Sequence, residues 1–169
     1  MTSYVLIADA SVERAILYAD LLRVMGFAPL IAEEGTFAVA TLTELGPPSL
    51  LVVDLALPRI DGFGLIRALR RLPGGDKTVV VAMSTSRDLR DKAIGQRARL
   101  GVAFVLAHAA SGESMRRVFH RLLTPAGRSA DDPLPVPPGD SEPSHRDPGI
   151  RLRVGYAPVP AARARLGSS

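Results

Sequence analysis

Short apolar segments alternate with amphipathic segments along the first 123 residues of the chain. The apolar segments are residues 4–8, 27–31, 50–53, 78–83 and 102–107, and the amphipathic segments are residues 12–25, 36–45, 61–72, 87–100 and 111–123. Short apolar runs are typical of strands covered on both faces, whereas apolar residues spaced three and four apart are typical of helices. Five strands that alternate with five helices predict an α/β fold with a parallel sheet wrapped on both faces.

Capping residues and one proline refine this pattern. Ser11 can cap the first helix, whose apolar positions from Val12 to Met25 are predicted to face the sheet, and Gly26 stands where its C-terminal cap belongs. Pro29 lies within the second apolar segment. Because proline has no N–H group to donate to a neighbouring strand, the second strand is predicted to lie at an edge of the sheet.

The chain changes character after residue 123. Nine of its 14 prolines lie in residues 124–169, and four arginines (151, 153, 163 and 165) lie near its end. Closely spaced prolines favour neither a helix nor a central strand. We therefore expect a folded domain over residues 1–123, a Pro-rich linker over 124–149 and a basic, disordered tail over 150–169.

Composition excludes several classes of protein. The 169 residues include no cysteine, which excludes a disulfide scaffold, a thiolate zinc site and a catalytic thiol. The apolar runs are far too short to span a membrane, and acidic residues interrupt the first of them, so no secretory signal is predicted. We expect a cytoplasmic protein without a membrane partner. We interpret the net charge of +4 as arising from charged side chains on a solvated surface.

Polar side chains follow four of the predicted strands at the point where each strand ends. Asp9 follows the first, Asp54 the third, Ser84 the fourth and His108 the fifth. In open parallel sheets, function collects at the carboxyl ends of the strands. These four residues are therefore the candidates for a functional site.

One segment carries a family resemblance. Residues 54–62, Asp-Leu-Ala-Leu-Pro-Arg-Ile-Asp-Gly, are similar to the pattern around the phosphorylated aspartate in the receiver domain of bacterial response regulators. Residues 79–85 resemble the fourth strand of that family with its switch hydroxyl. The resemblance covers residues 4–123, and it implies a doubly wound, five-stranded parallel sheet of order 2-1-3-4-5, flanked by five helices, as in the flavodoxin and CheY-like folds.

The resemblance also implies roles for the candidate residues. Asp54 would be the phosphoacceptor, and Ser84 would be the switch hydroxyl. The carboxylates of Asp9 and Asp54, with the backbone carbonyl of Ala56, would hold Mg²⁺, which prefers such hard oxygen ligands. No organic cofactor is implied.

Three positions depart from the family pattern. Ala10 stands where a second acid is expected, which predicts weakened Mg²⁺ binding. Val105 stands at the position of a switching aromatic residue. His108 stands at the position of a lysine, and an imidazole is charged only when protonated, so it would replace that lysine only in part. No other histidine lies near it in the sequence, which argues against a dedicated metal ligand.

The leading hypothesis is a stand-alone receiver in a histidine-to-aspartate phosphorelay, with no enzymatic activity beyond its own phosphorylation and dephosphorylation at Asp54. Its partners would be a histidine kinase or phosphotransfer protein, and an output protein that binds the face of the fourth helix, fifth strand and last helix. Seven basic residues are predicted to make that face basic: Arg87, Arg90, Lys92, Arg97, Arg99, Arg116 and Arg117. The chain after residue 123 is too short and Pro-rich for a DNA-binding output domain, so no nucleic acid partner is predicted. A homodimer remains open.

Three alternatives are kept. A pseudo-receiver would act as a docking or dimerisation module without phosphorylation. A receiver responsive to cyclic di-GMP would use the arginine-rich tail, since arginine suits phosphate groups. A phosphatase of the haloacid-dehalogenase type would need a second acid two residues after Asp9, where the chain has Ser11.

Overall fold

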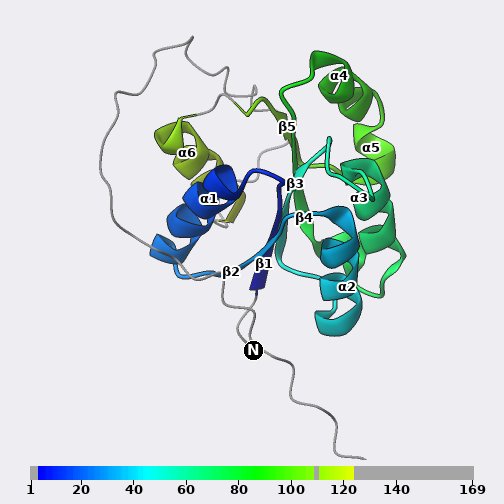
Figure 1. Cartoon of the computed structure of the whole chain (residues 1–169), viewed down its shortest axis with the longest axis horizontal. Coiled ribbons are helices and arrows are strands. Elements are labelled where there is room, and N and C mark those ends of the chain that lie inside the picture. The colour runs from blue at the N-terminus through cyan, green and yellow to red at the C-terminus, as the bar shows by residue number, and fades with distance from the viewer. Residues whose placement is uncertain (1–3, 109–110, 124–169) are drawn as a thin grey trace, which may run out of the picture. The chain divides into compact units, whose positions relative to one another are not determined.

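A computed structural model of the chain describes residues 4–108 and 111–123 (Figure 1). Its core is a five-stranded sheet in the order β2-β1-β3-β4-β5, with every neighbouring pair parallel. The strands are β1 (Tyr4–Ala8), β2 (Ala28–Ala32), β3 (Leu50–Asp54), β4 (Val79–Met83) and β5 (Phe104–Leu106). The predicted α/β fold, strand order and edge position of β2 are confirmed. The predicted linker over 124–149 and tail over 150–169 lie outside the described residues.

Helices cover both faces of the sheet. They are α1 (Val12–Val24), α2 (Gly35–Leu45), α3 (Gly62–Arg71), α4 (Arg87–Gly95), α5 (Arg97–Leu100) and α6 (Gly112–Leu123), and a short 3₁₀ helix, η1 (Gly75–Lys77), precedes β4. Figure 1 shows α1 and α6 on one face and α2 to α5 on the other. No helix within residues 4–108 and 111–123 is long and apolar enough to cross a membrane.

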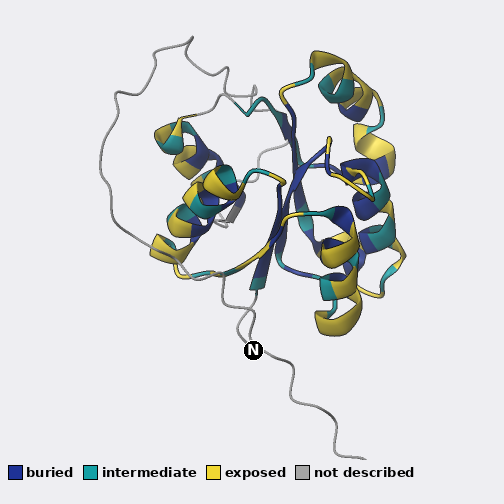
Figure 2. Ribbon diagram, in the orientation of Figure 1, coloured by how far each residue is buried: buried dark blue, intermediate teal, exposed yellow. Residues whose placement is uncertain are grey.

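Alternate residues of the strands build two apolar layers, one on each face of the sheet. Figure 2 shows the central strands as mostly buried, with exposed residues on the helices around them. Leu6 and Leu51 point into the layer beneath α2 and α3, whereas Ile7 and Val52 point into the layer beneath α1 and α6. All five residues of β3 are buried, as expected for a strand at the centre of the sheet. The two layers hold the carboxyl ends of the strands in fixed positions along one edge.

Two details of the helices differ from the sequence-based expectation. The predicted single helix over 87–100 is divided at Gln96, whose φ of −105° and ψ of 5° end α4 and begin α5. Within residues 4–108 and 111–123, six α-helices therefore flank the sheet where five were expected. Gly95, a poor helix former, immediately precedes this break. Val12, predicted to face the sheet, is 37% exposed, because it is the first residue of α1. Tyr18 is buried instead, packing edge-on against Phe119.

Candidate functional site

Backbone hydrogen bonds between neighbouring strands continue past the strand ends and fix the candidate residues at one edge of the sheet. The Asp9 N–H donates to Ala32 O on β2 (3.1 Å), and the Ser84 N–H donates to Leu106 O on β5 (3.1 Å). Asp54 is the last residue of β3 and pairs with Met83 on β4. The sequence-predicted residues of the first, third and fourth strands therefore lie at neighbouring positions along this edge.

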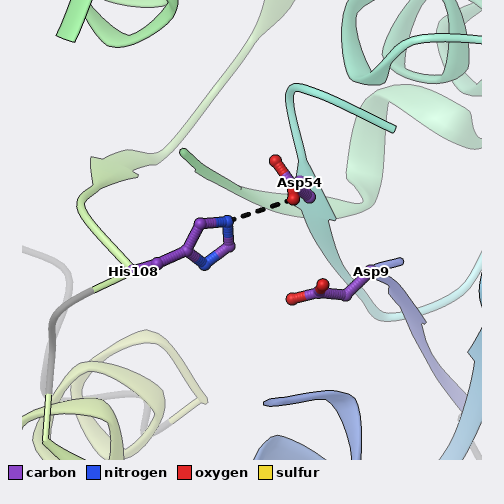
Figure 3. Close-up of side chains that lie close together, drawn as sticks. All are labelled: Asp9, Asp54 and His108. Atoms are coloured by element: carbon purple, nitrogen blue, oxygen red, sulfur yellow. Dashed lines mark ion pairs between the residues drawn. The ribbon is translucent and has the colours of Figure 1, made fainter. Parts of the chain in front are cut away.

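The side chains of Asp9, Asp54 and His108 point toward one another (Figure 3). Each offers one ligand atom, and these atoms all lie within 4.8 Å of one another. The two aspartates are buried, and the His108 side chain is 4% exposed. Together with Arg14, described below, we call these residues the edge cluster.

The loop after β3 holds Asp54 in place. The Leu55 N–H donates to Met83 O (2.8 Å), and the Gly62 N–H donates to Leu55 O (3.2 Å). A Cβ atom on Gly62 would lie 2.6 Å from Asp54 O, which is closer than such contacts occur. Asp61 caps α3 by accepting a hydrogen bond from the Gly64 N–H (2.7 Å). The Asp-Gly pair of the sequence motif thus turns the chain tightly beneath Asp54 and starts α3 at once.

The two carboxylate oxygens of Asp54 have different surroundings. Oδ1 accepts a hydrogen bond from the Ala56 N–H (2.9 Å). Oδ2 lies 3.3 Å from Arg14 Nη2 and 3.3 Å from His108 Nε2. Burial raises the pKa of the Asp54 carboxyl, but the His108 ring when protonated, the Ala56 N–H and Arg14 together outweigh it, so this pKa lies below its usual value. Oδ1 is thus anchored by the backbone, and Oδ2 faces the side chains of Arg14 and His108.

Arg14 is a member of the edge cluster that the sequence analysis did not identify. Its Nε donates to Asp9 Oδ2 (3.0 Å) and its Nη2 to Asp9 Oδ1 (2.8 Å), a bidentate pair, while the Ser11 N–H also donates to Asp9 Oδ1 (2.8 Å). The hydrogen bonds to Asp9 raise the pKa of the guanidinium, so it stays charged. Arg14 stands in the first turn of α1, which starts beside Asp9. This place in the sequence is the one feature that could have indicated its role.

His108 is buried without a hydrogen bond. Neither Nδ1 nor Nε2 has a partner among the described residues. The 3.3 Å between Nε2 and Asp54 Oδ2 is within the range of an ion pair for a protonated ring, but the contact does not have the geometry of a hydrogen bond. The atoms of this side chain therefore face the two carboxylates without a direct bond to either.

Ser84 is fully buried at the end of β4. Its hydroxyl oxygen accepts from the Ser86 N–H (3.1 Å), and its carbonyl accepts from Arg90 Nη1 (2.8 Å). The residue is thus held by the turn before α4 and not by a bond to Asp54. Val105 is buried in β5, whereas Ala10 is exposed. The roles of Ser84 as a switch hydroxyl and of the Ala56 carbonyl as a ligand stay predictions.

The residues present suit a divalent cation in part. Two carboxylates on neighbouring strands are the oxygen ligands that Mg²⁺ takes, with water completing its shell. Both residues that flank Asp9 in the chain are alanines, so Asp9 brings the only carboxylate of that turn. The guanidinium of Arg14 now bridges the two carboxylates. A cation that binds both aspartates must therefore displace Arg14.

Most of the basic side chains predicted to form an output face already contact other groups of the chain. Arg90 donates to two backbone carbonyls before α4, and Arg97 donates to Val102 O and Ala103 O. Lys92 Nζ lies 4.8 Å from the centre of the Phe63 ring. Three others pair with acids: Arg87 with Asp91, and Arg116 and Arg117 with Glu113. The positive charge of this face is thus smaller than its arginine count suggests.

Comparison with known proteins relates this chain to one family. The family model described as response regulator receiver domain matches residues 5–116. A curated relative from Rhizobium etli, named "Probable chemotaxis protein CheY", is 32% identical over 121 residues, which are 70% of this chain and 91% of that protein.

Solved structures share the fold. Chemotaxis protein CheY4 of Vibrio cholerae, crystallised at low pH, matches with a TM-score of 0.63 at 19% identity, over 72% of this chain and 99% of its own. A CheY-like receiver domain from Methylobacillus flagellatus matches at 0.59 and 24% identity, over 72% and 99%. The Mn²⁺-bound form of response regulator Rcp1 matches at 0.62 and 22% identity, over 79% and 99%.

Proposed function

The chain belongs to the response regulator receiver domain family, and on that premise we propose that it is a phosphorelay receiver that accepts a phosphoryl group on Asp54. One observation carries the proposal. The Asp54 carboxylate ends the central strand β3, is tied through Oδ1 to the Ala56 N–H, and presents Oδ2 to the basic groups of Arg14 and His108. That oxygen is the candidate nucleophile.

The reaction would transfer a phosphoryl group from a phosphohistidine to Asp54. Oδ2 forms the new bond to phosphorus, the bond from phosphorus to the histidine nitrogen breaks, and that nitrogen leaves with the bonding electrons and takes up a proton. Two anions approach each other in this step, so positive charge around the phosphoryl oxygens is needed. The low pKa of Asp54 keeps its carboxylate ionised and ready at neutral pH.

The positive charge can come from two sources in this chain. Mg²⁺ held by Asp9 and Asp54, with the Ala56 carbonyl as a further ligand, would neutralise the phosphoryl oxygens when bound. Arg14 and a protonated His108 already stand within 3.3 Å of Asp54 Oδ2 and could contact the same oxygens. His108 would then serve as a partial substitute for the family lysine, and Ser84 as the hydroxyl that moves toward the phosphorylated aspartate.

Partners follow from the same proposal. The phosphoryl donor would be a histidine kinase or a phosphotransfer protein in the cytoplasm, where such kinases present their phosphohistidine. The output protein would bind the face of α4, β5 and α6. We propose that the protein acts as a stand-alone module. Its chemistry would be limited to the gain and loss of the phosphoryl group on Asp54.

The test is phosphorylation of the full-length protein by acetyl phosphate with Mg²⁺, measured by intact mass. The unmodified protein should gain one phosphoryl group, Asp54→Asn should gain none, and Asp76→Asn, which changes an exposed acid of η1, should behave as the unmodified protein. Equal labelling of Asp54→Asn, or no labelling of the unmodified protein at any Mg²⁺ concentration, would refute the proposal.

A pseudo-receiver is the second candidate, because one observation favours it. Arg14 makes a bidentate pair with Asp9 and also contacts Asp54, which supplies a permanent cation between the two carboxylates. Such a site could stay in one conformation without phosphorylation. A partner that binds the Asp54→Asn variant as tightly as the unmodified protein would favour this candidate. The cyclic di-GMP alternative depends on residues 151–165, which lie outside the described residues.

A further inference from the structure

The His108 side chain poses a problem that the proposed function leaves open. Its side chain is only 4% exposed, yet neither ring nitrogen has a hydrogen-bond partner among the described residues. Buried polar groups in folded proteins are nearly always satisfied, because leaving one unpaired costs about 1–3 kcal/mol. An imidazole in this position is therefore expected to gain a partner in the functional state.

The neighbours of His108 identify the kind of partner. A ring nitrogen that carries no proton has a lone pair, and it lies beside two carboxylates, Asp9 and Asp54, that are also electron donors. Arg14 contacts the two carboxylates but not the ring, so the imidazole is the member of the set without a hydrogen-bond partner. A metal ion that accepts electron pairs from all three side chains would give the ring nitrogen a partner as well. A lysine, which the family pattern has at this position, could not act as such a ligand while protonated.

The spacing of the donors suits one metal ion. Nitrogen and oxygen ligands lie about 2.0–2.1 Å from a tetrahedral ion such as Zn²⁺, so two of them are about 3.3 Å apart. His108 Nε2 and Asp54 Oδ2 are 3.3 Å apart, and the ligand atoms of Asp9, Asp54 and His108 all lie within 4.8 Å of one another. The Asp9 atom needs only a small shift to complete a three-ligand site.

We propose that Asp9, Asp54 and His108 bind a first-row transition-metal ion of the Zn²⁺ or Co²⁺ type in preference to Mg²⁺. Imidazole nitrogen is a common ligand of Zn²⁺ and its neighbours in the first row, whereas Mg²⁺ prefers oxygen ligands. The replacement of lysine by histidine thus changes the metal preference of the edge cluster.

Arg14 is the group that the ion replaces. Its side chain is 33% exposed, so the guanidinium can turn toward solvent without crossing the core. The ion brings two positive charges to the two carboxylates, whereas the guanidinium of Arg14 brings one. Because a guanidinium does not lose its proton in proteins, Arg14 competes with the metal at every physiological pH.

The inference goes beyond the proposed function and does not need Asp54 to accept a phosphoryl group. A metal on His108 would occupy the nitrogen that otherwise contacts the phosphoryl oxygens. Metal binding and phosphorylation are measured separately below, so either proposal can fail while the other stands.

Co²⁺ is the probe, because its visible absorption bands report the ligands directly. Titration of the full-length protein with Co²⁺ should give intense bands that saturate at one equivalent, and Zn²⁺ should remove them while the same concentration of Mg²⁺ does not. His108→Gln should weaken Co²⁺ binding by at least about tenfold, since even loss of a group that only supports a ligand costs about 10- to 100-fold. His108→Lys should weaken it similarly, which gives a second variant should His108→Gln fold poorly.

The controls are the two other histidines of the chain, His120 and His145. His120→Gln and His145→Gln should bind Co²⁺ as the unmodified protein does, and Asp9→Asn should bind it more weakly. Circular dichroism of each variant establishes that it is folded. Co²⁺ bands that survive in folded His108→Gln and His108→Lys, that disappear in His120→Gln or His145→Gln, or that Mg²⁺ removes as readily as Zn²⁺ would overturn the inference.

Discussion

Arg14→Gln tests whether the guanidinium competes with a divalent cation for the edge cluster. The substitution removes the bidentate pair with Asp9, whose bonds are 2.8 and 3.0 Å long, and the 3.3 Å contact with Asp54 Oδ2. Because a cation must break these contacts to bind both carboxylates, their loss should raise the affinity of the protein for Mg²⁺. The glutamine keeps a polar side chain that is shorter and uncharged.

The size of the effect follows from the burial of the pair. A buried charge-assisted hydrogen bond contributes about 1.5–3 kcal/mol, and an exposed ion pair about 0.2–1 kcal/mol. Asp9 is 4% exposed and Arg14 is 33% exposed, so the pair lies between these cases. We take about 1–2 kcal/mol for the contacts that Mg²⁺ must break, which corresponds to an affinity increase of about 5- to 30-fold.

The assay is a calorimetric titration of full-length protein with Mg²⁺. Arg23→Gln is the matched control, because Arg23 pairs with Asp20 on the exposed side of the same helix and its loss removes the same charge. Arg14→Lys keeps the charge without the planar fork and should fall between Arg14→Gln and the unmodified protein. An Arg14→Gln affinity equal to or weaker than that of the unmodified protein would refute the competition.

Two further predictions concern stability. The pKa of Asp54 is lower in the folded protein than its unfolded value of about 3.9, so the carboxylate stabilises the fold above that pH and the stabilisation is lost as pH falls toward the folded-state pKa. Urea unfolding across acidic pH should therefore show a stability that falls more steeply for the unmodified protein than for Asp54→Asn, and parallel curves would contradict this. Gly62→Ala should destabilise the protein by about 1–3 kcal/mol, because the new Cβ meets backbone atoms at 2.6 and 2.7 Å. Gly95→Ala, with open space around it, should be neutral or stabilising in the same unfolding assay, and an equal loss in both variants would argue against the close contact.

The sequence predicted the layout of this fold because its strongest signals are local. Apolar segments and capping residues identified the strands and helices, and Pro29 placed β2 at the edge of the sheet. Once the strands were parallel, their carboxyl ends had to meet, which brought Asp9, Asp54 and Ser84 to one edge without any knowledge of the packing.

The interior of the edge cluster could not be predicted in the same way. Arg14 carries no motif, and only two of the 21 basic residues are lysines, so one arginine among many gave no distinct signal. Its contact with Asp9 depends on the direction in which α1 leaves β1. The orphaned nitrogens of His108 are likewise a property of burial in three dimensions. The break at Gln96 and the exposure of Val12 depend on how the helix ends lie on the sheet.

The most direct test of the central claim, that Asp54 accepts a phosphoryl group at this edge of the sheet, is beryllofluoride binding followed by fluorine NMR. Beryllofluoride joins a carboxylate oxygen as a phosphoryl group does, and it needs no donor protein. With Mg²⁺ present, the full-length protein and Asp76→Asn should both show bound fluorine resonances, and Asp54→Asn should show only the free species. Bound resonances in Asp54→Asn, or none in the unmodified protein, would contradict the account.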